Sequence, residues 1–456
     1  MSVNSFEKYF MSWSPEKERL TRPFYLSLAN CLEEDIRSGK LAPGTRLPPQ
    51  RELADYLGIN FTTITRAYDL CKERSLIYGV TGRGSFVASL PGTPKNREQT
   101  IELGIVNGFD TVSRTVIEAA ENVLRKGYLD QLFNYAEPAG HLHQRAAGVR
   151  WMERLGVKTD IAHTAVFSGA QNVISAALLS LFKLGDRIAT DEFTYSNLIG
   201  TARLAHIPLV PIPGDSGGMR PDKLEEACRK KKINGIFLMP DCANPTTIFL
   251  SEERKNALAA VIRKYNLVLI EDDYGGMRRT PPELPLFARL PEQTVYICGS
   301  TRNVCSGLRV TFAAFPEQFR EKLLSGLFHL NIKTSSIDAE IMTELIMSGK
   351  AEQILHEKQL LAKRANRIFD SIFPEYADPS KHGAFFRCLP LPCSAPDGIR
   401  LEEMLLRHGI TAYHSYRFSA QKFTERPFLR LSVSSAGSDE QLRQGLEITG
   451  KVIRSL

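Results

Sequence analysis

The sequence predicts a small helical head followed by a large α/β domain. Three observations lead to this prediction. The chain has 456 residues, well beyond the roughly 100–150 residues of an ordinary domain. Residues 20–90 hold a run of short helical patterns that closes on two strand-like segments. Beyond residue 100, apolar strand-like runs alternate with amphipathic helical ones, which predicts helices covering a mostly parallel sheet.

Composition narrows the class of protein. No apolar run approaches the roughly 18 residues that a membrane helix requires, and residues 1–20 lack the unbroken apolar stretch of a signal peptide, so we expect a cytoplasmic protein without a membrane partner. The 8 cysteines include no Cys-x-x-Cys pair, and we therefore expect neither a disulfide framework nor a metal site. The formal net charge of +7 is modest, but Lys and Arg outnumber Asp and Glu by nine to four over residues 40–97, a locally basic segment.

The head begins with an amphipathic helix over residues 22–38, in which every fourth residue is apolar: Phe24, Leu28, Leu32 and Ile36. Two prolines then precede a second, short helix that ends at Gly58, and Asn60 can cap a third. Two helices joined by a tight glycine turn form a helix-turn-helix, and residues 76–89 add two short strands around a glycine turn, a wing. Threonines and an arginine cluster at the start of the third helix, where a recognition helix presents side chains to base edges.

These motifs resemble the GntR-type winged helix-turn-helix over residues 21–89, with Leu-Pro-x-x-Arg-x-Leu-Ala at 47–54 and Gly-Arg-Gly-x-Phe-Val at 82–87. The resemblance implies binding to double-stranded DNA through Arg51, Thr62, Thr63, Arg66, Arg83 and Gly84. Phe61 and Thr65 stand where this family frequently has arginine, so base specificity is not carried over. Phe61 either contacts a thymine methyl group or is half-buried packing.

A linker over residues 90–100, rich in proline and polar residues, joins the head to the large domain at 101–456. In parallel sheets ligands bind beyond the carboxyl ends of the strands. Two such places are suggestive: the turn Ser168–Gln171 before a helix, where free amides can hold a phosphate, and the carboxylates and tyrosine that end the buried run 267–274. Each place is weak evidence for a ligand site when taken alone, because glycine turns and surface aspartates are common in proteins without one.

Their order along the chain resembles a fold-type I aminotransferase, and behind a GntR-type head it resembles the MocR family of regulators, which use pyridoxal phosphate. The matching stretches are YAEPAG, SGAQN, GDRIATDEFTY, ANPTT, EDDY, SGLR and FLRLSVSS. The resemblance implies a PLP-dependent-transferase-like fold with a smaller C-terminal α+β subdomain at about 335–456. It also implies a cofactor site that comprises Gly169, Ala170, Tyr195, Asn244, Asp272, Tyr274, Thr301, Arg302, Arg309 and, from a second subunit, Tyr135. Arg430 would clamp a ligand carboxylate.

One position breaks this pattern. Counting back from Gly307-Leu308-Arg309, the Schiff-base lysine of the family falls on Arg302, and no lysine lies within nineteen residues on either side. A guanidinium stays protonated and is a poor imine former, whereas a lysine amine can be deprotonated by burial. We therefore expect no catalytic residue at this position, no covalent cofactor and no aminotransferase activity.

The sequence thus predicts a DNA-binding transcription regulator whose degenerate aminotransferase-like domain senses a small anionic ligand: vitamin B6 phosphate, an amino acid or an adduct of the two. Fold-type I sites lie near a two-fold interface, so the resemblance also implies a homodimer. Two alternatives stay open: an active pyridoxal phosphate enzyme with an accessory DNA-binding head, and a regulator whose large domain binds a protein partner. The operator, the effector, the sign of regulation and the role of the extension 1–20 are not predicted.

Overall fold

The computed structural model describes residues 11–80, 84–88, 100–109, 113–273, 283–300, 302–392, 397–421 and 427–456. Three predicted site residues, Arg83, Tyr274 and Thr301, lie outside this description. The chain divides into two compact units, Met1–Gln99 and Thr100–Leu456.

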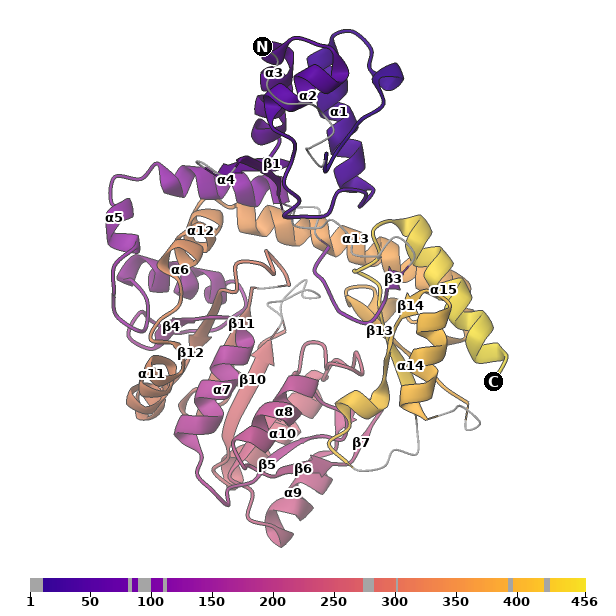
Figure 1. The fold of residues 1–456 in the computed structure, drawn as a ribbon. Coiled ribbons are helices and arrows are strands. Elements are labelled where there is room, and N and C mark those ends of the chain that lie inside the picture. Colours follow the sequence, from indigo (N-terminus) through magenta and orange to yellow (C-terminus); the bar gives the residue numbers. More distant parts are fainter. Residues whose placement is uncertain are drawn as a thin grey trace. The chain divides into compact units, whose positions relative to one another are not determined.

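The first unit is a winged helix-turn-helix, as the sequence predicted (Figure 1). Its elements are η2 (Lys17–Arg19), α1 (Phe24–Arg37), α2 (Gln50–Leu57), α3 (Phe61–Glu73), β1 (Ile77–Val80) and β2 (Gly84–Val87), and the two strands pair antiparallel. Gly58 ends α2 in the left-handed region at φ 62°, where glycine carries no steric penalty. The predicted cap of α3 is confirmed, because the Asn60 side chain accepts a hydrogen bond from the Thr62 amide at 2.9 Å.

The hydrophobic core of this unit includes residues that precede its predicted first helix. Trp13 and Leu20, which precede the expected start at residue 21, are buried among the apolar faces of the three helices. The Trp13 indole N–H donates to the Asp35 carboxylate at 2.8 Å, which satisfies its polar atom inside the core. The segment around Trp13 is therefore part of the head, and it is not helical.

The second unit contains a seven-stranded sheet in the order β4-β12-β11-β10-β9-β5-β6, in which β12 runs antiparallel to its neighbours. The strands are β4 (Thr164–Phe167), β5 (Ile188–Asp191), β6 (Leu209–Ile212), β9 (Gly235–Leu238), β10 (Val268–Asp273), β11 (Thr294–Gly299) and β12 (Thr311–Ala314), with a hairpin of β7 (Gly214–Asp215) and β8 (Gly218–Met219). The mostly parallel sheet predicted from the alternating pattern is confirmed.

Helices cover both faces of this sheet (Figure 1). The helices of this unit are α4 (Ser113–Leu124), α5 (Leu129–Leu132), α6 (Leu142–Glu153), α7 (Ala170–Leu181), α8 (Ser196–Leu204), α9 (Pro221–Lys230), α10 (Glu252–Lys264), α11 (Glu317–Asn331), α12 (Ser336–Met347), α13 (Lys350–Ile372), α14 (Gly398–Arg407) and α15 (Asp439–Arg454). The alternation of side chains along β11 shows why both faces are covered: Val295 and Ile297 face a core with α7, α8 and α11, whereas Tyr296 and Cys298 face a core with α6, α12 and α13.

A smaller α+β layer completes this unit. Its sheet has the order β13-β16-β15, and α13, α14 and α15 pack in its core. The strands are β13 (Phe386–Pro390), β15 (Tyr413–His414) and β16 (Phe428–Ser432), beside the parallel pair β3 (Ile101–Glu102) and β14 (Ile410–Thr411). The pairing of β3 with β14 brings the first residues of the large unit, including the buried Leu103, into the C-terminal subdomain. Among the described residues no helix is long and apolar enough to cross a bilayer.

Candidate functional site

Four loops that follow parallel strands line one cavity of the large unit. The strands β4, β5, β10 and β11 all point the same way, so the residues after their carboxyl ends meet at one edge of the sheet. The cavity has a volume of ≈ 70 Å³, and its lining residues are Ala170, Gln171, Tyr195, Asp272, Gly299, Arg302 and Arg309. Five of these seven residues were predicted as site residues from the sequence: Ala170, Tyr195, Asp272, Arg302 and Arg309.

One corner of this cavity is suited to an anion. Gly169 precedes α7 with φ +85°, and a Cβ atom there would lie 2.3 Å from Nη2 of Arg309, so only glycine lets the guanidinium approach the helix start. Arg309 itself has φ 52°, an uncommon conformation for a residue with a side chain. The expectation that the Gly169 amide holds a phosphate is not met here, since that N–H donates to the Phe167 carbonyl at 2.8 Å. The amides of Ala170 and Gln171, in the first turn of α7, are the available donors.

Asp272 is the carboxyl group among the residues that line the cavity. The carboxyl is 4% exposed, and its buried Oδ1 has no hydrogen-bond partner in the described part of the chain. Burial raises the pKa of Asp272 to about 7, the Arg302 guanidinium lowers it, and the neighbouring Asp273 raises it. An orphaned carboxyl oxygen in a cavity suits a ligand that brings an N–H donor, such as a protonated ring nitrogen.

Arg302 contributes from the end of β11. Its charge acts on both Asp272 and Tyr195, and it lines a second, small cavity of ≈ 20 Å³ with Asn303 and Phe385. Its backbone carbonyl accepts a hydrogen bond from the buried Lys358 Nζ at 3.0 Å. The same Nζ donates to the Val304 carbonyl at 2.9 Å, so the amine of Lys358 is hydrogen-bonded to two backbone carbonyls.

Asn244 connects the predicted ring site to the predicted carboxylate clamp. Its side chain is fully buried, and its Oδ1 accepts from Nη1 of Arg430 at 3.1 Å, while its Nδ2 has no partner in the described part of the chain. Arg430 also donates to the Gly104 carbonyl, and its guanidinium lies 4.7 Å from the Phe418 ring centroid. In this conformation Arg430 is thus held by protein groups, and an incoming carboxylate would share its guanidinium with them.

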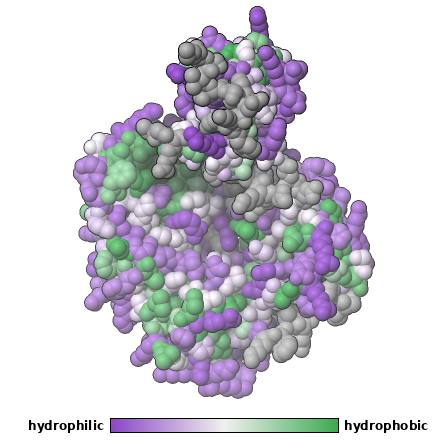
Figure 2. All heavy atoms as spheres, viewed as in Figure 1, coloured by the Kyte–Doolittle hydropathy of each residue, from purple (hydrophilic) through white to green (hydrophobic). Residues whose placement is uncertain are grey.

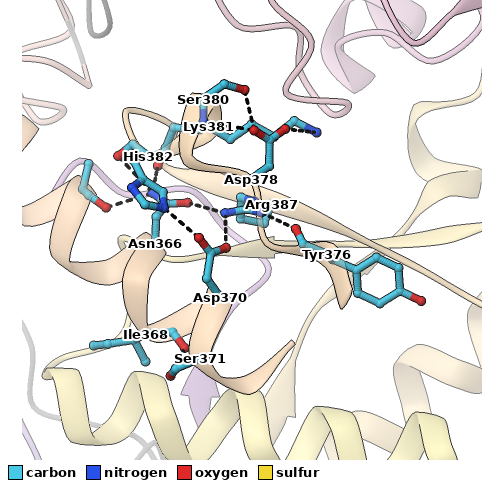
Figure 3. Close-up of polar contacts among 12 residues, drawn as sticks. Asn366, Ile368, Asp370, Ser371, Tyr376, Asp378, Ser380, Lys381, His382 and Arg387 are labelled. Carbon is cyan, nitrogen blue, oxygen red and sulfur yellow. Dashed lines mark hydrogen bonds and ion pairs between the residues drawn. The ribbon is translucent and has the colours of Figure 1, made fainter. Parts of the chain in front are cut away.

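A buried ion pair fixes the strand beside Arg430 (Figure 3). Arg387 donates to the Asp370 carboxylate at 2.9 Å, to Asn366 Oδ1 at 3.2 Å and to the Tyr376 carbonyl at 2.8 Å. Arg387 belongs to β13, whose next residue, Cys388, pairs with Arg430 of β16. The network therefore holds β13 in place behind the arginine clamp.

In the head, the described residues predicted to contact DNA lie on three elements: Thr62, Thr63 and Arg66 on α3, Arg51 on α2 and Gly84 in β2. All of them are exposed except Thr63, which is partly exposed. Arg51 lies 5.9 Å from the Phe61 ring centroid, and Arg66 lies 4.5 Å from that of Tyr25. Phe61 is 43% exposed, so its ring is accessible beside a cation, and both a contact with a thymine methyl group and half-buried packing remain open for this residue. Arg46 was missed by the sequence reasoning: it forms a bridge with Phe86 of β2 and its side chain approaches Gly84 of the wing.

Two family models match the chain. The model described as aminotransferase class I and II matches residues 100–448, and the model of bacterial regulatory proteins of the gntR family matches residues 24–87. The regulator YdeF of Bacillus subtilis (strain 168), named an uncharacterized HTH-type transcriptional regulator, is 34% identical over the full length of both chains. The chain is a GntR-type regulator of the aminotransferase class I and II family.

Other relatives agree with this MocR-type architecture. The vitamin B6 salvage pathway transcriptional repressor PtsJ of Salmonella typhimurium is 26% identical over 64% of this chain and 67% of its own length. The α-aminoadipate aminotransferase LysN of Thermus thermophilus matches with a TM-score of 0.71 at 19% identity, over 78% of this chain and 93% of that one. The kynurenine aminotransferase of Pyrococcus horikoshii matches with a TM-score of 0.72 at 18% identity, over 78% and 91%. The predicted fold class is confirmed.

The aminotransferase class I and II fold implies pyridoxal phosphate binding in this family, and the polar groups of the regulator's cavity fit that cofactor. The orphaned Asp272 oxygen suits its ring nitrogen. Asn244 does not line the cavity, although its buried Nδ2 has no partner in the described part of the chain. Arg309 and the first amides of α7 suit its phosphate. The sequence reasoning missed Gln171, whose Oε1 is buried without a partner in the described part of the chain.

Tyr135, like Gly169, Asn244 and Arg430, is a predicted site residue that does not line the cavity of this single chain. It is 84% exposed and does not line the cavity. Its proposed role, reaching the phosphate from a second subunit, stays a prediction.

Proposed function

We propose that the regulator senses a small anionic ligand in the cavity of its aminotransferase-like domain, that it binds this ligand non-covalently, and that it has no aminotransferase activity. The ligand classes that suit the cavity are vitamin B6 phosphate, an amino acid and an adduct of the two. The observation that carries the proposal is the cavity itself, which is lined by two arginines, Arg302 and Arg309, and by the orphaned carboxyl of Asp272.

Each described side chain has a distinct part in binding. Arg309 and the α7 amides neutralise a dianionic phosphate, and Asp272 accepts from the ring nitrogen. Tyr195, whose pKa is raised by burial, offers an apolar ring face. When bound, pyridoxal phosphate would supply an electrophilic aldehyde, but Arg302 offers no nucleophilic amine to attach it. Arg430 and Asn244 would then orient the carboxylate of an amino acid ligand.

The large unit also carries a surface that suits a second copy of this chain. Apolar side chains gather over α4 and α5 on the face shown in Figure 2. Ile117, Leu124, Phe133 and Leu142 are between 54% and 70% exposed, and the exposed Tyr135 lies in the same segment of chain as the last two. We infer a homodimer through this surface, which would present two DNA-binding heads to paired half-sites and bring Tyr135 towards the partner's cavity.

The test compares the wild-type protein with Arg302→Lys. Both proteins are mixed with pyridoxal phosphate, reduced with borohydride and measured by intact mass. With the wild type, the absorbance of pyridoxal phosphate is expected to change on binding, and dialysis is expected to reverse this change. The intact mass of the wild type is expected to stay the same. Arg302→Lys is expected to gain one phosphopyridoxyl group.

Three outcomes would contradict the proposal. A reduced adduct on the wild type would show covalent attachment through another lysine, with the buried Lys358 the first to be replaced in mapping it. No spectral change with pyridoxal phosphate, with an amino acid or with both would exclude this ligand class. Transamination by the wild type, followed with several amino acid and keto acid pairs, would restore the enzyme alternative.

A further inference from the structure

The large unit has a larger pocket, distinct from the two small cavities described above. It has a volume of ≈ 340 Å³, within the range of small-molecule sites, and it lies where the adjacent parallel strands β5 and β9 end. Its lining combines apolar side chains with carboxylates. The apolar side chains are Phe193, Leu238, Met239, Ile248 and Leu250, and the carboxylates are Asp191, Glu192 and Asp215.

The three carboxylates differ in what holds them. Asp215 forms an ion pair with Arg254, both carboxylate oxygens lying 2.9 Å from Nη2. Glu192 accepts from the Gln421 side chain at 2.7 Å. Asp191, the last residue of β5, is partly exposed and lines this pocket, and its carboxylate has neither a hydrogen bond nor an ion pair within the described part of the chain. It is the group in this pocket whose charge nothing described compensates.

We propose that this pocket is a second ligand site, and that it binds a protonated primary amine attached to an apolar body, with Asp191 as the counter-ion. An ammonium group supplies both the charge and the donors that Asp191 lacks. The aliphatic and aromatic wall supplies the surface for an alkyl or aryl group. No lysine, arginine or histidine is among the lining side chains described, so an anion would meet only repulsion here.

The state of Asp191 supports a charge-dependent site. Burial raises the pKa of Asp191 to about 7, and the neighbouring Glu192 carboxylate contributes to this rise; Asp215 faces the same pocket but is paired with Arg254. An aliphatic amine, whose pKa is about 10, stays protonated across this range. Affinity for the amine is therefore expected to increase as the pH rises through about 7, where Asp191 becomes charged.

The two sites share segments of chain. Phe193 lines this pocket and Tyr195 lines the cofactor cavity, and Ala243 lines this pocket beside Asn244. An occupant that presses on these two segments will shift the residues that face the first ligand. Because coupling between two sites is reciprocal, each ligand is then expected to change the affinity for the other.

The test measures binding of 2-phenylethylamine to the full chain by isothermal titration calorimetry, with 2-phenylethanol as the uncharged match. The amine is expected to bind and the alcohol not. Asp191→Asn, which removes the charge at constant volume, is expected to weaken amine binding by at least about tenfold. Asp222→Asn, an exposed aspartate on α9 outside the pocket, serves as the control and is expected to bind like the wild type.

A second variant keeps the test decisive if Asp191→Asn fails to fold. Ser216→Trp places a large ring at an exposed residue of the pocket lining while keeping Asp191 itself unchanged, and is expected to abolish amine binding. The proposal is overturned if the amine does not bind at about 10 mM, if the alcohol binds equally well, or if binding survives Asp191→Asn or Ser216→Trp. Pyridoxal phosphate titrated into the same variants reports separately on the first site.

Discussion

Replacing Asp272 with asparagine is expected to stabilise the unliganded large unit at alkaline pH while weakening its ligand binding. Asp272 is 4% exposed, and its pKa of about 7 lies above the ordinary 3.8. The folded state therefore keeps a proton that the unfolded chain has already lost. The contribution of Asp272 to the free energy of unfolding is fully present below about pH 4. It falls as the pH rises towards about 7 and stays reduced above that pH.

The size of this effect follows from the two pKa values. The difference between 3.8 and about 7 corresponds to ~4 kcal/mol of unfolding free energy between the acidic and alkaline limits. Asparagine has nearly the same volume and no charge, so Asp272→Asn is expected to recover up to ~4 kcal/mol at about pH 8 and almost nothing at about pH 4. The same change removes the acceptor for a protonated ring nitrogen and is expected to weaken pyridoxal phosphate binding by about tenfold or more.

The assay is urea unfolding followed by tryptophan fluorescence. The chain has 2 tryptophans, Trp13 in the head and Trp151 in a core of the large unit, so a Trp13→Phe background restricts the signal to the large unit. Glu357→Gln, an exposed carboxylate on α13, controls for the general loss of a negative charge. The reasoning is refuted if Asp272→Asn and its parent change stability in parallel between about pH 5 and about pH 8.

Three further changes test other parts of the molecule. Gly169→Ala forces a side chain into φ +85° and into the neighbouring arginine, so it should cost about 1–3 kcal/mol in thermal unfolding and weaken phosphate binding in calorimetry; an unchanged melting temperature would contradict this. Arg66→Ala should weaken DNA binding in a fluorescence titration and reduce its salt dependence by about one phosphate contact, whereas Lys72→Ala, at the far end of the same helix, should not; equal losses would count against the assigned DNA face. Phe133→Glu, at a side chain that is 70% exposed, should yield monomers in sedimentation velocity, and Leu184→Glu, at one that is 82% exposed, should not; a dimer in both would place the interface elsewhere.

Much of the candidate site could be predicted because its residues lie at positions that local sequence defines. Asn60 and Gly58 mark the ends of helices, since capping and left-handed turns depend on single residues and their immediate neighbours. Apolar runs marked the parallel strands, and the rule that ligands bind beyond their carboxyl ends directed attention to Asp272 and the turn before α7. The position of Arg302 followed from counting along a motif.

The parts of the site and of the fold that could not be predicted depend on contacts between residues far apart in the sequence. Asn244 and Arg430 are separated by 186 residues, and no local pattern indicates that they share a hydrogen bond. The close approach of Arg309 to Gly169, the burial of Trp13 in the head, and the pairing of β3 with β14 arise in the same way.

The sequence by itself determined the order of helices and strands, the two kinds of domain and the charged residues available to a ligand, because periodicity, caps and turns act over a few residues. Only the tertiary structure decided which of those charges are compensated. Asp191 and Asp215 look alike in the sequence, yet one lines the pocket without a described partner and the other is paired with Arg254. That difference is set by which side chains the folded chain brings within hydrogen-bond distance, and the proposal of a second ligand site rests on it.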